Sequence, residues 1–263
     1  MPYLDLQAAT ASITTAYPTF TGLAACTGDT LVVRTLSSDQ AAELIDFGIY
    51  GAAGNVVRVR SPYLHDDVQG IRSRYLAGDS SGLTGFKPTQ RLRGQDTLIA
   101  ESSGTGSAAQ YVYWQLAWYG QLQASPSVYL SLAEFEARAI EETSTEVAVT
   151  SSATAGQWGS ALLSAGTGVL KANQNYAVIG YELDVACAAW GFYGPDTGNF
   201  RAGGPGITTR QFTRNWFLDL ARLTGYACIP VFNSQNATGT NVQVNHYTAS
   251  TAVNVNLITA RLK

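Results

Sequence analysis

The sequence FGIYGAAGNVVR at residues 47–58 returns as WGFYGPDTGNFR at residues 190–201. Each copy has an aromatic residue, a glycine, an apolar residue, Tyr-Gly, a short spacer, Gly-Asn and an arginine. Three further blocks repeat in the same order, roughly 140 positions apart, namely IRSRYL with TRNWFL, LTGFKP with LTGYACIP, and QYVYWQL with TAVNVNL. Four ordered blocks at nearly constant spacing predict an internal duplication with a unit of roughly 100 residues, the size of a small domain.

The repeated block predicts a β-hairpin in each copy. An incoming strand, FGIYG or WGFYG, meets a turn rich in Gly, Asn and Asp, and an outgoing strand begins near the arginine. Gly and Asn tolerate the positive φ angles that hairpin turns need. A structural turn is therefore favoured over a ligand-binding loop. The predicted turn residues are Gly51, Gly54 and Asn55 in the first copy and Gly194, Gly198 and Asn199 in the second.

Most of the chain is predicted as β-strand, because runs of Val, Ile and aromatic residues are bounded by Gly, Asn, Asp and Ser. The predicted strands are 29–36, 42–51, 55–60, 110–120, 146–151, 176–194, 227–232 and 241–247. Within 55–60, Val57 and Val59 are expected on one face and Arg58 and Arg60 on the other. The apolar and aromatic alternation of 110–120 predicts a strand that is covered on both faces.

Three helices are expected, at 61–78, 131–144 and 208–225. The first begins with Ser61-Pro62, the second with a capping box of Ser131 and Glu134, and the third ends at Gly225. The sequence thus predicts a mainly β fold of two tandem, internally duplicated β-sandwiches, with one short helix in each and a connecting helix. The expected divisions are an N-terminal arm 1–24, a first sandwich 25–125, a linker helix 126–145 and a second sandwich 146–263.

Composition limits the possible functions. Of 263 residues, 46% are apolar and 13% are charged, and the formal net charge is −3. This charged share is about half that of an ordinary globular protein. Basic runs are absent from the sequence, which argues against sequence-specific nucleic-acid binding. The three lysines are far outnumbered by arginines, which suit fixed bidentate contacts within and between subunits.

Cysteine usage and the first residues favour a protein made in a reducing compartment. Cys26, Cys187 and Cys228 are odd in number and widely spaced, so neither a disulfide framework nor a zinc site is expected. The start MPYLDLQAAT lacks the pattern of a signal peptide, and no apolar run reaches the ~20 residues of a membrane span.

Residues capable of chemistry do not form a recognisable constellation. His65 and His246 fall at unrelated places in the two repeats, and the pairs Asp66-Asp67 and Glu141-Glu142 are expected on solvated helix faces. Asp196, Thr197 and Asn199 could supply oxygens to calcium, but a turn-stabilising aspartate is favoured. The aromatic residues of 111–119 could stack on a sugar, although buried strand faces fit better. We therefore predict no enzyme, no catalytic residues, no cofactor and no metal.

The order of elements resembles that of the double jelly-roll major capsid proteins of tailless icosahedral viruses, including membrane-containing bacteriophages. The similarity covers roughly residues 25–263 and includes RNWFLDLARLTGYACIPVF (214–232), where an aromatic-rich helix leads into an apolar strand. It is a similarity of pattern rather than of motif. The chain is compact for that family, with little room for tower loops on the outer surface.

The resemblance implies a virion protein, made in the host cytoplasm, that assembles as homotrimers of pseudo-hexagonal outline into a capsid shell. Its expected partners are further copies of itself, vertex (penton) and minor capsid proteins, and, as in the membrane-containing bacteriophages of the family, an internal lipid membrane. Two alternatives stay open on the sequence: a capsid cement or decoration protein, and a two-domain carbohydrate-binding or receptor-binding spike protein. A hydrolase on a β-scaffold is the least favoured.

Overall fold

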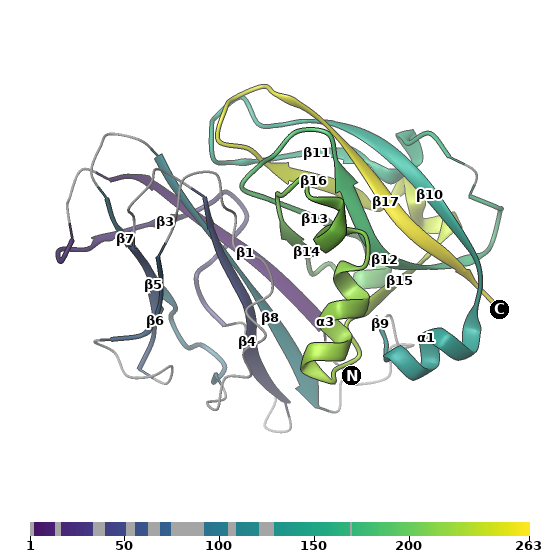
Figure 1. Ribbon diagram of the computed structural model, residues 1–263, viewed down its shortest axis with the longest axis horizontal. Coiled ribbons are helices and arrows are strands. Elements are labelled where there is room, and N and C mark those ends of the chain that lie inside the picture. Colours follow the sequence, from purple (N-terminus) through teal and green to yellow (C-terminus); the bar gives the residue numbers. More distant parts are fainter. Residues whose placement is uncertain are drawn as a thin grey trace.

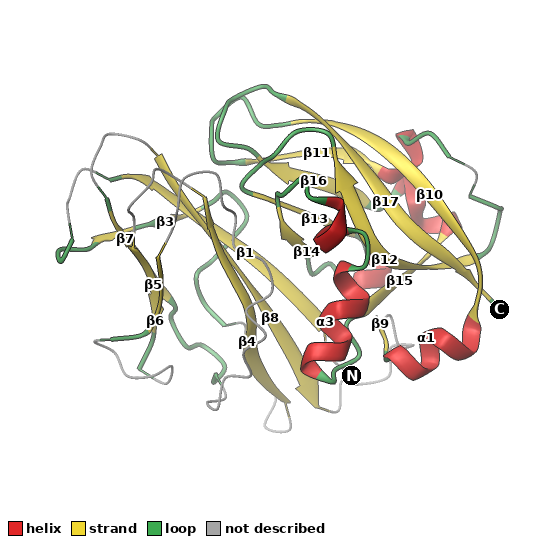
Figure 2. Ribbon diagram, in the orientation of Figure 1, coloured by secondary structure: helices red, strands yellow, loops and turns green. Residues whose placement is uncertain are grey.

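The protein is mainly β-structure, arranged in several antiparallel sheets that pack in pairs (Figures 1 and 2). The structure, a computed structural model, describes residues 3–13, 17–33, 40–50, 56–62, 69–74, 92–104, 109–120, 129–168 and 170–263. The prediction of a mainly β, sandwich-like architecture is confirmed. Figure 1 shows two halves side by side, with the strands of the first half on the left and those of the second on the right.

The first half contains two four-stranded sheets, with the orders β3-β1-β8-β4 and β2-β7-β5-β6. Their strands are β1 (Tyr3–Ser12), β2 (Thr21–Gly22), β3 (Ala24–Ala25), β4 (Gln40–Tyr50), β5 (Val56–Arg60), β6 (Ile71–Arg74), β7 (Ile99–Ser103) and β8 (Ala109–Gly120). Aliphatic side chains from both sheets meet between them, among them Ala9, Leu44, Val57, Val59 and Ala100. Val57 and Val59 face this core as predicted, while Arg58 and Arg60 lie on the opposite face of β5.

The second half contains a five-stranded sheet, β10-β17-β12-β15-β9, and a four-stranded sheet, β11-β16-β13-β14. Their strands are β9 (Tyr129–Leu130), β10 (Ala139–Thr150), β11 (Trp158–Leu162), β12 (Asn175–Leu183), β13 (Ala189–Tyr193), β14 (Ala202–Pro205), β15 (Ile229–Asn233), β16 (Asn241–Asn245) and β17 (Ala252–Leu262). The helices are α1 (Leu132–Arg138), α2 (Arg210–Thr213) and α3 (Trp216–Thr224), with short 3-10 turns η1 (Leu163–Ala165), η2 (Pro195–Thr197) and η3 (Ser234–Thr238).

Aromatic residues fill the core of the second half. Trp190, Phe192 and Phe217 are fully buried and contact one another edge-on or stacked, with ring centroids 6.3–6.4 Å apart. Alternating valines of β10 and β17 complete the core from the five-stranded sheet. The period-2 pattern therefore buries one side of the C-terminal part of β10 and leaves the other side for solvent or neighbours, whereas β12 and β13 are buried on both sides along most of their length.

The sheets of the two halves have matching strand orders. In the first half β8 lies between β1 and β4, and in the second half β17 lies between β10 and β12. In each case the last strand of the half pairs with its first long strand. The remaining sheets, β2-β7-β5-β6 and β11-β16-β13-β14, also match when the strands are ranked along the chain.

The repeated sequence block does not occupy matching places. Residues 190–201 form the predicted hairpin, because β13 and β14 pair antiparallel. Residues 47–58 do not, because β4 pairs with β8 whereas β5 pairs with β6 and β7 in the other sheet. The hairpin prediction is therefore wrong for the first copy, where the same pattern connects two sheets. The turn residues Gly51, Gly54 and Asn55 lie outside the described residues.

Two of the helix predictions need correction. Of the expected helix 61–78, the described part 71–74 is strand β6, which pairs with β5. The helix expected at 131–144 begins with the predicted capping box but ends at Arg138, and the chain continues as β10. In this segment the alternation that places Val147 and Val149 in the core, together with pairing to β17, outweighs the helical pattern.

The third helix prediction is confirmed in outline. Residues 208–225 form α2 and α3, which end at Gly225 in the left-handed conformation with φ 72°. Trp216, Phe217 and Leu220 are buried as expected, whereas the side chain of Phe212 is 58% exposed. The predicted strand 176–194 is interrupted and gives β12 and β13 in different sheets.

The segment assigned to an N-terminal arm holds an inner strand. β1 lies between β3 and β8, and it pairs with β8 along its whole length. Its alternating apolar residues Leu4, Leu6 and Ala8 are buried. Residues 3–12 are thus part of the sheet that faces the second half.

Candidate functional site

The two halves meet along an interface that we call the seam, where apolar residues of both halves pack together and Asp29 of the first half contacts Trp158 and Arg201 of the second. Leu6 and Ala8 of β1 pack with Cys26 and with Ala189 of β13, and Trp158 of β11 borders this cluster. Leu4 of β1 and Ile45 of β4 extend into the core of the second half. The sheet β3-β1-β8-β4 therefore packs against the second half through its outward side.

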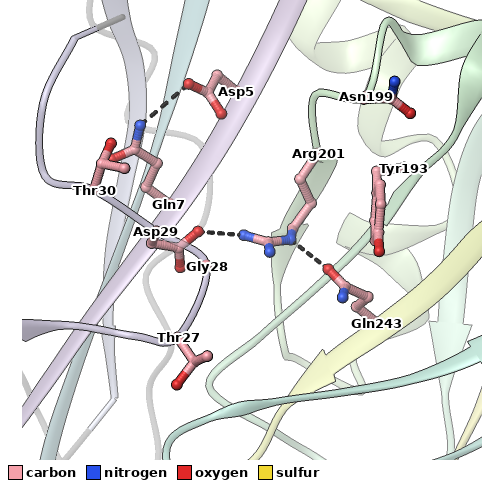
Figure 3. A pocket seen from close by; sticks show the side chains of 10 residues that line it. All are labelled: Asp5, Gln7, Thr27, Gly28, Asp29, Thr30, Tyr193, Asn199, Arg201 and Gln243. Carbon is pink, nitrogen blue, oxygen red and sulfur yellow. Dashed lines mark hydrogen bonds and ion pairs between the residues drawn. The ribbon is translucent and has the colours of Figure 1, made fainter.

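Arg201 is the central polar residue of the seam (Figure 3). Its Nε donates to Oε1 of Gln243 at 2.6 Å, and its guanidinium carbon lies 4.0 Å from the centre of the Trp158 ring. Its Nη1 donates across the seam to Oδ1 of Asp29 at 2.6 Å and to the carbonyl oxygen of Leu6 at 3.0 Å. Gln243 and Trp158 of the second half thus hold the guanidinium in position, and Asp29 of the first half pairs with its charge.

Asp29 has its two carboxylate oxygens fully engaged. Oδ1 accepts from Arg201, and Oδ2 accepts from Trp158 Nε1 at 2.7 Å and from the backbone N–H of Ala8 at 3.0 Å. The side chain is 3% exposed, and that of Arg201 is 12% exposed. A buried ion pair with complete hydrogen bonding avoids the large cost of an uncompensated charge.

The backbone allows Arg201 to reach this position. Arg201 follows the hairpin turn, and its side chain crosses Gly191 of β13, where an added Cβ would lie 2.7 Å from Arg201 Cγ. Gly191 pairs with Gln243 of β16 in the sheet register. A glycine at this place on β13 opens the path along which the arginine reaches the amide.

A second polar contact crosses the seam at Cys26. Its thiol donates to the carbonyl oxygen of Gly156 at 3.0 Å and accepts from Asn245 Nδ2 at 3.3 Å. Burial, reinforced by the nearby negative charge of Asp29, raises the pKa of Cys26 to about 12. This thiol is therefore a protonated packing residue rather than a nucleophile.

A cavity of about 450 Å³ opens beside the ion pair, between the loop that carries Asp29 and the turn after β13. It is lined by Asp5, Gln7, Thr27, Gly28, Asp29, Thr30, Tyr193, Asn199, Arg201 and Gln243. Figure 3 shows Asp29 and Arg201 turned toward each other, and Gln7 donating to Asp5 at 3.1 Å. Arg201 is paired with Asp29, and the Asp5 carboxylate accepts a hydrogen bond from a neutral amide, so the lining carries one more negative than positive charge.

The predicted turn residues of the second copy are only partly explained by positive φ. Gly198 and Asn199 have φ angles of 65° and 60°, as predicted. Gly194 is extended, with φ −179°, and its role is different, because an added Cβ would lie 2.6 Å from Thr240 Oγ1. Gly194 is thus placed by close packing on the strand that leads into β16.

Two of the possible calcium ligands of this turn form hydrogen bonds within the protein, Thr197 inside the turn and Asp196 to the segment around η3. Asp196 accepts from the backbone N–H of Asn233 at 2.9 Å and from the side-chain amide of Asn236 at 2.9 Å. Thr197 Oγ1 donates to the carbonyl oxygen of Phe200 at 2.8 Å. These contacts favour the turn-stabilising interpretation. Within the described residues, no group of three or more His, Cys, Asp or Glu side chains could hold a metal ion.

The other candidates are not brought together with the seam cluster. His246 is buried, its Nδ1 accepts from the backbone N–H of Thr248 at 2.8 Å, and burial lowers its pKa. Glu141 and Glu142 lie on strand β10 rather than on a helix, and pair with Lys171 and Arg214 respectively. His65, Asp66, Asp67 and the side chains of 111–119 lie outside the described residues.

The three cysteines are free and buried. Burial raises the pKa of Cys228 to about 12 and that of Cys187 still further. No helix among the described residues is long and apolar enough to cross a membrane.

Sequence reasoning missed the seam cluster of Asp29, Trp158, Arg201 and Gln243. The one available signal was the arginine that closes both copies of the repeated block, Arg58 and Arg201. Its partners come from distant parts of the chain, which a single sequence does not connect.

The chain matches no protein-family model, no curated protein and no solved structure. Function is therefore argued from the arrangement of its own residues.

Proposed function

We propose that the protein is a virion structural protein, a major capsid protein in which two copies of a jelly roll lie in tandem and whose chains assemble as trimers into an icosahedral shell. No catalytic role is part of this proposal. The observation that carries it is the matching strand order of the two halves.

A jelly roll places eight successive strands in two sheets, ordered first-eighth-third-sixth and second-seventh-fourth-fifth. The strands β10 to β17 have this order, with the short β9 added at one edge. The first half has the same order in β1-β8-β4 and β2-β7-β5-β6. Leu92 bridges to Ala42 of β4, at the place of the sixth strand.

The seam supports a fixed relation between the two sandwiches. The two halves are held together by apolar contacts, by the buried ion pair of Arg201 with Asp29 and by the hydrogen bonds of Cys26. Each chain then contributes two similar sandwiches in a fixed arrangement, so a trimer presents six similar units. Such a trimer suits a position of six-fold packing in a shell. A weakly charged, polar surface fits a protein that covers its flanks with neighbouring copies.

The purified chain tests the proposal directly. Light scattering coupled to size-exclusion chromatography measures the mass in solution, and electron microscopy shows the particles formed at high concentration. Trimers of six-lobed outline, or closed shells, are the expected result. A strict monomer at all concentrations overturns the proposal, and the same monomer bound to a glycan array favours the carbohydrate-binding alternative. Binding only to preformed shells of another protein identifies a cement protein instead.

A further inference from the structure

A second arginine cluster in the first half is built in the same way as the cluster at the seam, with an aromatic ring and a side-chain oxygen around the arginine. Arg58 Nε donates to Glu101 Oε2 at 2.5 Å, and its guanidinium carbon lies 4.1 Å from the centre of the Phe20 ring. Arg201 has the same two kinds of partner, the side-chain oxygen of Gln243 and the ring of Trp158. Each cluster is thus an arginine held between an aromatic ring and an acceptor.

The partners also occupy matching strands. Phe20 immediately precedes β2 and Trp158 begins β11, the first strands of their sheets. Glu101 lies on β7 and Gln243 on β16, the second strands. Glu101 pairs with Arg58 in the sheet register, and Gln243 pairs with Gly191, which Arg201 crosses. The two guanidinium groups therefore occupy similar places, although different strands carry them.

The seam shows what such a cluster does. On the second half, the outer side of β11-β16-β13-β14 meets the sheet β3-β1-β8-β4, and Arg201 delivers its charge to Asp29 there. The corresponding outer side of β2-β7-β5-β6 is turned away from the seam, at the far left of Figure 1. At the other end of the molecule, the five-stranded sheet containing β10 and β17 corresponds to the sheet that receives Arg201.

These two outer surfaces carry opposite charge among the described residues. We name the first the arginine face, defined by Phe20, Arg58, Arg60, Arg72 and Glu101, where three arginines against one glutamate leave a formal charge of +2. We name the second the acidic face, defined by Glu142, Glu146, Glu182, Asp184, Arg210 and Arg214, where four carboxylates against two arginines leave −2.

The acidic face is more polar than the corresponding surface at the seam, which is the outward side of the sheet β3-β1-β8-β4. A polar surface is expected of a contact between separate chains. On its outward side β10 carries Glu142, Ser144 and Glu146, whereas β1 carries buried apolar residues. α2 and α3 cover one end of this sheet, where the backbone carbonyl of Arg214 touches Gly180. The remaining surface is polar and exposed, and suits reversible electrostatic docking.

We propose that the arginine face binds the acidic face of a second copy of this chain, head to tail, in an intermolecular version of the seam. This proposal rests on the proposed function, whose trimer it supplies with a specific contact. Because each copy uses two different faces, the contact is heterologous, and it closes into a ring when the rotation between copies allows it. Arg72, which is exposed at the arginine face, and Glu146, which is exposed at the acidic face, are the residues to reverse.

The test compares the parent chain with Arg72→Glu, Glu146→Arg and the double variant, using mass photometry over a dilution series. Each single reversal is expected to raise the half-dissociation concentration of the oligomer about tenfold or more, because it sets like charges opposite each other. The double variant restores opposite charge and should return to within about threefold of the parent. Arg222→Glu on α3 and Glu136→Arg on α1 are matched controls at exposed positions outside both faces, and should assemble like the parent.

The outcomes separate this contact from the proposed function. Oligomers that form equally well with either single reversal overturn the contact and leave the capsid proposal standing. A parent chain that stays monomeric overturns both. Circular dichroism and thermal unfolding of each variant establish that it is folded, and recovery of assembly in the double variant excludes misfolding as the cause of a single variant's defect.

Discussion

The arginine clusters of the two halves differ chiefly in one acceptor. Arg201 is held by Gln243, a neutral amide, and its charge is directed across the seam to Asp29. Arg58 is held by Glu101, which also accepts from Arg60 Nε at 2.9 Å. An amide fixes a guanidinium without neutralising it, whereas one carboxylate between two arginines leaves one positive charge in excess. The acceptor therefore determines how much charge a sandwich can offer to its neighbour.

Arg201→Ala is expected to have the largest effect. It removes one partner of a buried ion pair and leaves the Asp29 carboxylate, 3% exposed, without its cation. We expect the free energy of unfolding to fall by about 3–5 kcal/mol, as is typical when a buried pair is broken. Urea unfolding followed by circular dichroism measures the loss.

Arg222→Ala is the matched control, because Arg222 forms an exposed pair with Asp219 within α3. It should lose no more than about 0.5 kcal/mol. Equal losses for the two variants would show that Arg201 does not anchor the seam.

Gly203→Ala should have the next largest effect, because Gly203 of β14 lies where the sheets of the two halves approach closely. An added Cβ would touch the carbonyl oxygen of Trp190 and lie 2.7 Å from Gly191 Cα and 2.8 Å from Leu6 Cδ2. Overpacking of this kind costs about 1–3 kcal/mol. Gly22→Ala on β2 is the control, because nothing lies within 4 Å of its added Cβ. If calorimetry gave both variants the same unfolding temperature, the close approach at the seam would be contradicted.

Much of the fold could be predicted from the sequence because burial of one strand face leaves a period-2 pattern. Val57 and Val59, and the apolar run that becomes β15, were identified in this way. The same reasoning failed for 139–144, where helix and strand patterns compete locally and pairing with β17 decides. It also failed for 47–58, because a Gly-Asn turn between two strands does not specify whether they share a sheet.

The seam could not be predicted, because its partners are far apart in the sequence and each is unremarkable alone. Asp29 and Arg201 are separated by 172 positions. The repeated arginine was visible, but its role depends on Gly191, which opens its path, and on the ring of Trp158. Long-range polar contacts of this kind leave no periodic signal.

Glu101→Gln replaces the carboxylate that accepts from Arg58 with an amide, the kind of acceptor that Gln243 provides for Arg201. Burial alone would raise the pKa of Glu101, but hydrogen bonds from Arg60 and Arg58 outweigh burial and lower it. A lowered carboxyl pKa stabilises the fold above the unfolded-state pKa, and this stabilisation is lost as the pH falls through the folded-state value. We expect the variant to lose about 1–2 kcal/mol at pH 7.

The pH dependence provides the check on this substitution. The difference in unfolding free energy between parent and variant should shrink as the pH falls below the ordinary glutamate pKa of about 4.3 and on through the lower pKa of the folded-state Glu101 carboxyl. A difference that stayed constant from pH 7 to pH 3 would mean that the lost stability arises from packing rather than from charge.

Gly198→Ala should have an effect of the same small size as Glu101→Gln, and it tests the hairpin of the second half. Gly198 has φ 65°, where an L-residue with a Cβ is disfavoured by about 1–2 kcal/mol. Asn199, at φ 60°, is the matched control, because Asn199→Gly relaxes the same backbone region and should change stability by less than about 0.5 kcal/mol. The turn also positions Arg201, three residues after Gly198. A destabilised Gly198→Ala chain that keeps its mass in solution would therefore separate the cost of the turn from assembly. A neutral Gly198→Ala would mean that the turn can adopt another conformation without disturbing the seam.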